Sequence, residues 1–196
     1  LQGLEIDLAN QLGDYLDMRV KFVELPWGKQ ISSLEEGKID IIMSGMTVTP
    51  KRSYRVAFAK SYLQSGQIML VKMDKAKNFS SGIVSLMGNR YTIGTISGTT
   101  GDYFITKSIN GAKVVRYKTS KGAVKGLIEG EIDVVVHDAP IICYYAAVNE
   151  ADKLTPILQM GTEEYLAWAI NKTDSALLAK VNGFVDAIRA DGRLKA

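Results

Sequence analysis

The chain has 196 residues, which is enough for one large domain or for two small domains that each bury a core. Its 24 basic and 21 acidic residues leave a formal charge of +3, too little to indicate binding to nucleic acid or a membrane surface. The single cysteine, Cys143, excludes an internal disulfide, and its apolar neighbours predict a buried thiol. No apolar run reaches the length of a membrane-spanning helix.

The first part of the chain alternates helical and extended patterns. Leucines at every fourth position predict an amphipathic helix over residues 4–16. Apolar residues then predict strands over 19–25 and 39–43. A capping residue before proline, Thr49-Pro50, predicts the start of a single helical turn over 50–55.

The rest of the chain continues this alternation. The expected strands cover 67–72, 91–95, 114–117, 132–136 and 165–170, the expected helices start near Asp102, Ser120, Pro140 and Ala176, and residues 73–85 form a polar loop. Strands that alternate with helices are typical of an α/β protein with mostly parallel sheets.

One stretch is written twice. Leu34 to Met43 (LEEGKIDIIM) reappears as Leu127 to Val136 (LIEGEIDVVV), and each copy reads as a helix end, a glycine stop and a buried strand. The residues that follow, Ser44-Gly45 and His137-Asp138, therefore lie at the carboxyl ends of matching strands. Open α/β sheets bind ligands at that edge, so the repeat predicts two similar lobes with a ligand in a cleft between them.

The repeat also sets the expected domain boundaries. Residues 1–66 and 165–196 form the first lobe, and residues 67–164 form a second lobe inserted into it. The chain crosses between the lobes near Ser65–Gln67 and Gly161–Glu164, which predicts a two-stranded hinge of the kind used in domain closure.

Arg52 is the first candidate for ligand binding. A planar guanidinium can hold a carboxylate through two parallel, charge-assisted hydrogen bonds, which lysine cannot copy. From the residues alone, Arg52 could equally be one of several solvated charges on its helical turn, together with Lys51 and Arg55.

Three further places could contact a ligand. The loop Ser97–Gly101 precedes a helix and could bind an anion, but it lacks the ending of a nucleotide-binding P-loop. Asp138 could accept hydrogen bonds from an ammonium group, or cap the helix that starts at Pro140. Trp27 could pack on a ligand or in the core, and the only histidine, His137, is expected to be structural.

Two classes of site are not indicated. With one histidine and one cysteine, the chain has no metal-binding cluster of recognised spacing. No G-x-S-x-G nucleophile elbow accompanies His137 either.

One stretch is specific enough to suggest a family: Gly45-Met46-Thr47-Val48-Thr49-Pro50-Lys51-Arg52, with Phe58 and Tyr62 downstream. Over essentially its whole length, the chain resembles the extracytoplasmic amino-acid-binding proteins of ABC importers, the type II solute-binding proteins of family 3. The resemblance implies a two-lobed type II periplasmic-binding-protein fold in which each lobe is a mostly parallel sheet flanked by helices.

The resemblance also implies roles for particular residues. Arg52, Thr47 and the backbone of Gly45 would hold the α-carboxylate of a free amino acid, joined by Thr99 and Thr100 from the opposite lobe. Asp138 would take the ammonium group, and Trp27 would pack on the ligand side chain. Tyr62 would support the cleft wall or hinge.

The function implied is binding without catalysis, with no cofactor and no metal. The protein would be a monomer in the periplasm or on the outer face of the cytoplasmic membrane, and its partner would be a membrane importer permease. The same closure could instead serve the sensor domain of a membrane receptor such as a histidine kinase.

A third alternative is an enzyme that resembles cyclohexadienyl dehydratase. It would need a buried general acid, and Glu163 and Glu164 near the second crossing are the candidates, although we expect both to be solvated hinge charges. Family members also begin with a further strand upstream of Gly3. We therefore expect more residues before Leu1 and an unpaired strand edge in the first lobe.

Overall fold

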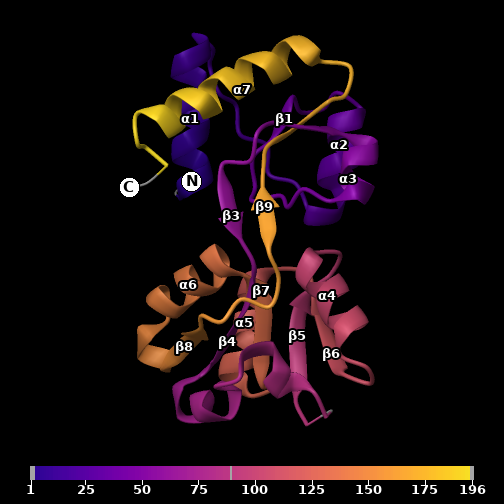
Figure 1. Cartoon of the computed structure of the whole chain (residues 1–196), viewed down its shortest axis with the longest axis vertical. Coiled ribbons are helices and arrows are strands. Elements are labelled where there is room, and N and C mark those ends of the chain that lie inside the picture. Colours follow the sequence, from indigo (N-terminus) through magenta and orange to yellow (C-terminus); the bar gives the residue numbers. More distant parts are fainter. Residues whose placement is uncertain (1–2, 89, 195–196) are drawn as a thin grey trace. The chain divides into compact units, whose positions relative to one another are not determined.

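The chain divides into two compact units in a computed structural model that describes residues 3–88 and 90–194. Unit 1 consists of residues 1–64 and 165–196, and unit 2 of residues 65–164. The ends of the predicted first lobe, residues 1–2 and 195–196, lie outside the described residues. Figure 1 labels the longer helices and several strands of both units.

Unit 1 combines helices with a small antiparallel sheet. Its helices are α1 (Leu4–Leu16), the 3-10 helix η1 (Trp27–Lys29), α2 (Gln30–Glu35), α3 (Pro50–Arg55) and α7 (Ser175–Ala190). The sheet has the order β1-β10-β2, with β1 (Ile41–Ile42), β2 (Ala57–Phe58) and β10 (Ala169–Ile170), and both pairings are antiparallel.

The apolar faces of α1 and α7 form the main core of unit 1. Leu8 and Leu12 of α1 pack with Phe184 and Ile188 of α7 around Trp168, and all five side chains are buried. In Figure 1, α7 crosses α1, and the two helices are in contact. Leu8 and Leu12, two of the regularly spaced leucines that predicted α1, therefore lie on the face that this helix buries.

Unit 2 contains a mixed sheet of five strands in the order β6-β5-β7-β4-β8. The strands are β4 (Gln67–Lys72), β5 (Thr92–Ile96), β6 (Lys113–Tyr117), β7 (Val134–Asp138) and β8 (Leu154–Ile157). The helices are α4 (Thr100–Ser108), α5 (Ser120–Glu129), α6 (Ala139–Val148) and the 3-10 helices η2 (Met73–Phe79), η3 (Gly82–Leu86) and η4 (Glu150–Asp152).

Both faces of this sheet are covered. Ile68 and Leu70 of β4 pack with residues of α5 and α6, whereas Met69 and Val71 pack with residues of α4, η2 and η3. Successive side chains of a strand point to opposite faces, so a continuous apolar run is what a strand buried on both faces requires.

A two-stranded sheet carries both passages of the chain from one unit to the other. It pairs β3 (Leu63–Ser65) with β9 (Glu164–Leu166), and the boundaries between the units fall within these two strands.

The repeated stretch folds in the same way in both units. Gly37 follows α2 with φ of 69°, and Gly130 follows α5 with φ of 81°, so both glycines adopt the left-handed conformation that ends a helix. The strands that follow are β1 and β7. β7 pairs with β5 on one side and β4 on the other, whereas β1 pairs only with β10 among the described residues.

Several local predictions are wrong. Residues 19–25 form no strand, and Val20, Phe22 and Val23 are at least 39% exposed. A strand needs a hydrogen-bonded neighbour as well as an apolar pattern, and these residues pair with none in the described chain. Residues 73–85, predicted as a loop, contain η2 and η3, whose short turns give little periodic signal.

The prediction of mostly parallel sheets agrees with unit 2, where β5, β6, β7 and β8 run in one direction and β4 runs opposite to them. It fails for the small sheet of unit 1, where both pairings are antiparallel. In unit 2 the β5–β6 and β5–β7 pairs are parallel, but β4 is antiparallel to both β7 and β8. The reason is connectivity: β4 enters unit 2 directly from the passage out of unit 1, whereas β7 and β8 are joined through α6, the kind of helical crossover that strands of the same direction need. Cys143, predicted to be buried, is exposed on α6, where neighbouring Ile142 occupies the buried face.

Candidate ligand-binding site

Arg52 is positioned by the start of α3. The Thr49 hydroxyl oxygen accepts a hydrogen bond from the Arg52 backbone N–H at 3.2 Å, and Pro50 occupies the first turn, as the sequence predicted. The Arg52 side chain donates from Nη1 to the Thr47 carbonyl oxygen at 2.8 Å. Its guanidinium carbon lies 5.3 Å from the centre of the Trp27 ring, a cation–π distance. We call Trp27, Thr47 and Arg52 the Arg52 cluster.

The turn over residues 44–48 leads into this cluster. Gly45 has a φ of 69°, and its backbone N–H donates to Oε1 of Glu5 at 2.8 Å. Further along, the Met46 carbonyl oxygen accepts from the Ala167 N–H at 3.0 Å. The turn is therefore held from two sides by other segments of unit 1.

The Asp138 side chain does not form the hydrogen bond expected of a helix cap. The residue occupies the N-cap position of α6, but its side chain makes no capping hydrogen bond. Its Oδ1 atom accepts instead from Nε2 of Gln67. Asp138 is 8% exposed, so its carboxylate is part of a buried polar cluster.

Gln67 joins Asp138 to a second carboxylate, that of Glu164. The Gln67 amide nitrogen lies 3.0 Å from Glu164 Oε1 and 3.2 Å from the Thr100 hydroxyl oxygen. Thr100 and Thr162 both donate to Glu164, at 2.8 and 2.9 Å. We call Gln67, Thr100, Asp138, Thr162 and Glu164 the Asp138 cluster. It brings two carboxylates together in unit 2.

Thr99 is engaged within its own loop. Its hydroxyl donates to the Ile96 carbonyl oxygen at 2.7 Å and accepts from the Asp102 N–H, which makes Thr99 the N-cap of α4. Its backbone N–H also donates to Ile96. The Asp102 carboxylate in turn accepts from the Gly98 N–H and from Arg116. The loop is therefore held by several hydrogen bonds, with the first-turn N–H groups of α4 at its end.

The structure thus gathers the predicted residues into two sets. Trp27, Thr47 and Arg52 lie together in unit 1, with Gly45 at the start of the same turn, and Thr100 and Asp138 lie together in unit 2. Thr99 adjoins Thr100 as the cap of α4.

Other residues that the sequence singled out have supporting places. Tyr62 is buried against Trp168, with ring centres 5.0 Å apart. His137 is buried, and its Nδ1 accepts from the Asp138 N–H at 2.7 Å. Glu163 is exposed as expected, but Glu164 is buried in the Asp138 cluster, so the expectation that both glutamates are solvated is wrong.

Sequence reasoning missed Glu5 and Gln67. Glu5 follows the first leucine of α1 and looks like an ordinary acidic residue in a first helical turn. Gln67 stands at the head of an apolar strand, and a polar residue in that position was the available signal.

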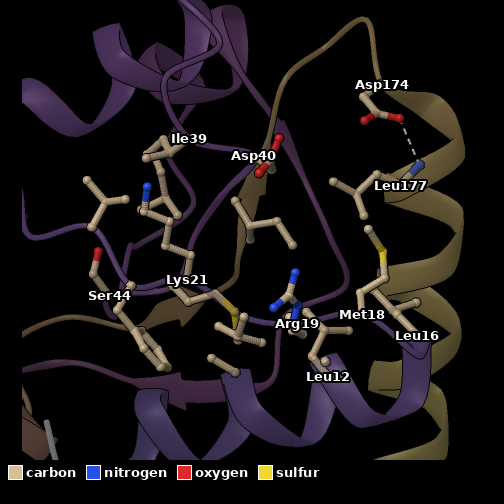
Figure 2. Close-up of a pocket in the computed structure, with 18 of the residues that line it drawn as sticks. Leu12, Leu16, Met18, Arg19, Lys21, Ile39, Asp40, Ser44, Asp174 and Leu177 are labelled. Carbon is tan, nitrogen blue, oxygen red and sulfur yellow. Dashed lines mark hydrogen bonds between the residues drawn. The ribbon is translucent and has the colours of Figure 1, made fainter.

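A separate groove of about 590 Å³ lies in unit 1. Figure 2 shows Leu12 and Leu16 of α1, Leu177 of α7 and Ile39, which precedes β1, around a common space. Residues 18–23 also line it, and none of the seven predicted ligand-binding residues does. The groove therefore lies beside β1 and residues 19–25.

Over residues 3–88 and 90–194, no three or more His, Cys, Asp or Glu side chains are grouped so as to hold a metal ion. Within the same ranges, no helix has the length and apolar character needed to cross a membrane.

The whole chain, residues 1–196, matches the family of bacterial extracellular solute-binding proteins, family 3. The chain belongs to this family.

Individual relatives agree with this assignment. The chain is 33% identical to arginine-binding protein 1 of an ABC transporter of Escherichia coli (strain K12), over 97% of this chain and 77% of the relative. It is 29% identical to the glutamine-binding protein GlnH of an ABC transporter of Bacillus subtilis (strain 168), over 98% of this chain and 70% of the relative.

A solved structure extends the likeness to the fold. The ancestral amino-acid-binding protein AncCDT-1, a precursor of cyclohexadienyl dehydratase, superposes with a TM-score of 0.89 and 33% identity, over 99% of this chain and 82% of its own. The predicted α/β class and type II periplasmic-binding-protein fold are confirmed. The named relatives are binding proteins, not enzymes.

Proposed function

We propose that this protein binds a free amino acid or a close analogue outside the cytoplasm and delivers it to an ABC importer. The observation that carries the proposal is the charge of the two clusters. Unit 1 presents the guanidinium of Arg52, and unit 2 presents the carboxylates of Asp138 and Glu164. An amino acid carries the two complementary charges, a carboxylate and an ammonium group.

Arg52 binds the ligand carboxylate in this proposal. Its contacts with Thr47 and Trp27 restrict the orientation of the guanidinium, so less conformational freedom is lost when the carboxylate binds. Thr47 and the backbone of Gly45 supply further polar groups, and Trp27 packs on the ligand side chain.

Thr100 and the first-turn N–H groups of α4 add donors from unit 2. A helix N-terminus favours a negative charge through its oriented N–H groups. Thr99 holds this loop in place as the helix cap, which is how we propose that it contributes to binding. Asp138 accepts from the ligand ammonium, and the Gln67 amide orients its carboxylate.

Binding of one ligand by groups from both units favours the conformation in which both can reach it. We propose that this conformation is what an importer permease recognises. Use of the same change in a sensor domain of a membrane receptor is the alternative, and the protein itself is a monomer.

Arg52→Ala tests the assignment. Calorimetric titration of the wild-type protein with amino acids should give saturable binding, which Arg52→Ala should reduce to an undetectable level because the carboxylate loses its charged partner. Arg55→Ala is the matched control, since Arg55 lies on the same helix but pairs with Glu35. Equal binding by Arg52→Ala and the wild type would refute the proposed site.

We also propose that the protein catalyses no reaction. The link of AncCDT-1 to a dehydratase, together with the buried Glu164, makes prephenate and arogenate the substrates to test. We expect no turnover of either. Steady product formation that disappears in Glu164→Gln would instead establish an enzyme.

A further inference from the structure

Glu5 joins three segments of unit 1. Its Oε1 atom accepts from the Gly45 backbone N–H at 2.8 Å and from the Tyr62 hydroxyl, and its Oε2 atom accepts from Trp168 Nε1 at 2.9 Å. The partners come from three separate parts of the sequence, so Glu5 ties α1 to the turn after β1 and to a buried aromatic pair.

The position of Glu5 in the first turn of α1 does not explain these contacts. An acidic residue there interacts favourably with the helix dipole from any solvent-facing rotamer. The carboxylate of Glu5 is instead partly buried and accepts from donors outside its own helix.

The contact with Gly45 reaches the turn that we propose binds the ligand. Because an N–H and the preceding carbonyl share one rigid plane, the bond to Glu5 fixes the orientation of the peptide between Ser44 and Gly45. Gly45 has no side chain to restrain it and a φ of 69°, so an external restraint is needed to hold one conformation.

The far side of the turn is held independently. The Met46 carbonyl oxygen accepts from Ala167, and the Val48 N–H donates to Tyr165. Glu5 therefore holds the backbone at the end of the turn that these two bonds do not reach, where the Ser44 side chain also donates to Gln30 at 2.8 Å.

We propose that Glu5 is a positioning residue for ligand recognition: by holding the Gly45 peptide, it presets the turn over residues 44–48 for the amino acid. This inference rests on the proposed function, because it assigns Glu5 a role at the same site. The carboxylate suits the role because a hydrogen bond to an ionised acceptor is stronger than one between neutral groups.

Three variants separate positioning from folding. Glu5→Gln keeps the shape of the side chain but leaves one amide group, which cannot accept on both ends. Tyr62→Phe removes a different partner of Glu5 and leaves the Gly45 contact in place. Asp7→Asn is the matched control, since it removes the same charge from an exposed position in the same helical turn.

The measurements are the Kd of an amino acid by calorimetry and the melting temperature of each variant. We expect Glu5→Gln to raise the Kd by about tenfold, the effect of losing one hydrogen bond to a charged group. Tyr62→Phe should lower the melting temperature without raising the Kd, and Asp7→Asn should change neither. If Glu5→Gln does not fold, Glu5→Asp replaces it, because it withdraws the charge by one methylene group.

A spectroscopic readout reports on the Gly45 contact itself. In a ¹H–¹⁵N spectrum without ligand, the Gly45 amide proton should shift upfield in the Glu5 variant and stay in place in Asp7→Asn. A variant that loses melting temperature but keeps the wild-type Kd would overturn the inference and leave the proposed function intact. If the wild type itself binds no amino acid, the proposed function fails first and the inference falls with it.

Discussion

Asp138 occupies a helix start, where an acidic side chain could either cap the helix or contact a ligand. The sequence allowed either a cap or a ligand contact, and the structure places its carboxylate on Gln67 and not on the N–H groups of α6. A cap that makes no hydrogen bond contributes little to helix stability. This placement of the buried carboxylate is consistent with the ammonium contact that we propose for it.

Asp138→Asn tests that explanation at the residue scale. We expect amino-acid binding to weaken by about tenfold or more, because the ammonium loses its charged partner. Binding of simple carboxylates that lack an ammonium group should not weaken. Calorimetric titration with one ligand of each kind measures both, and equal weakening for both kinds would contradict the assignment.

Thr119→Ala is the control for helix capping. Thr119 accepts from the Gly122 N–H at 3.1 Å and so is a true cap of α5. This variant should lose about 1 kcal/mol of unfolding free energy in urea and keep the wild-type affinity.

The pair of Glu35 and Arg55 predicts part of the acid sensitivity of unit 1. The hydrogen bond from Arg55 lowers the pKa of the Glu35 carboxyl below its usual value. A carboxylate with a lowered folded-state pKa stabilises the fold above its unfolded pKa, and this contribution is lost as the pH falls through the folded value. Stability should therefore decline below about pH 4.3.

Glu35→Gln should flatten this part of the decline, measured by urea unfolding across the acid range. Glu36→Gln, which leaves the pair intact, should keep the wild-type profile. Identical profiles for Glu35→Gln and the wild type would show that the pair does not contribute.

Residues with a local signal were the ones that could be predicted from the sequence. Thr49 and Pro50 act on their own helix turn, and their pattern correctly predicts the start of α3, which carries Arg52. Glu5, Gln67 and Glu164 act on partners that are remote in sequence, with separations of up to 163 positions. No local pattern distinguishes such residues from solvated ones, so only the tertiary structure reveals them.

At the scale of elements, the close approach of two chain passages depends on Gly66. A Cβ atom at this position would lie 2.1 Å from the backbone carbonyl oxygen of Thr162. Gly66→Ala should therefore destabilise unit 2 by about 1–3 kcal/mol, as forced overpacking does. Gly28→Ala is the control, because its Cβ would meet nothing within 4 Å, and urea unfolding should show no comparable loss.

The two copies of the repeat differ in their neighbours, which predicts different local stability. β7 has a paired strand on each side, whereas β1 has one paired strand and the groove. Amide hydrogen exchange should be slower for Val134 and Val135 than for Ile41 and Ile42. Equal protection of the two strands would contradict this description of β1 as an edge.

Elements were predictable where the signal lies within them. The helix–glycine–strand repeat was recognised because glycine stops and apolar runs are local, and both glycines have the expected left-handed conformation. Residues 19–25 carry the same kind of apolar pattern but form no strand, because strand formation also needs a partner. The reversed directions of β4 and β10 were not predicted for a similar reason: strand direction depends on connections that the pattern of one segment does not contain.

At the scale of the whole molecule, the central claim is that the clusters of both units act on one amino acid. A ligand that binds only the folded protein raises its stability by mass action, by about 2.7 kcal/mol at a concentration of 100 Kd. Variants in either cluster should therefore reduce the same ligand-induced stabilisation. Arg52→Ala and Asp138→Asn lie in different units, which makes them a matched pair for this comparison.

The most direct test is a thermal-shift screen of the protein against the common amino acids and a set of simple carboxylates, repeated with Arg52→Ala. The account predicts a melting temperature that rises with the concentration of one or a few amino acids, and no such rise in the variant. A folded wild-type protein whose melting temperature responds to no amino acid, or a variant that responds as the wild type does, would contradict it.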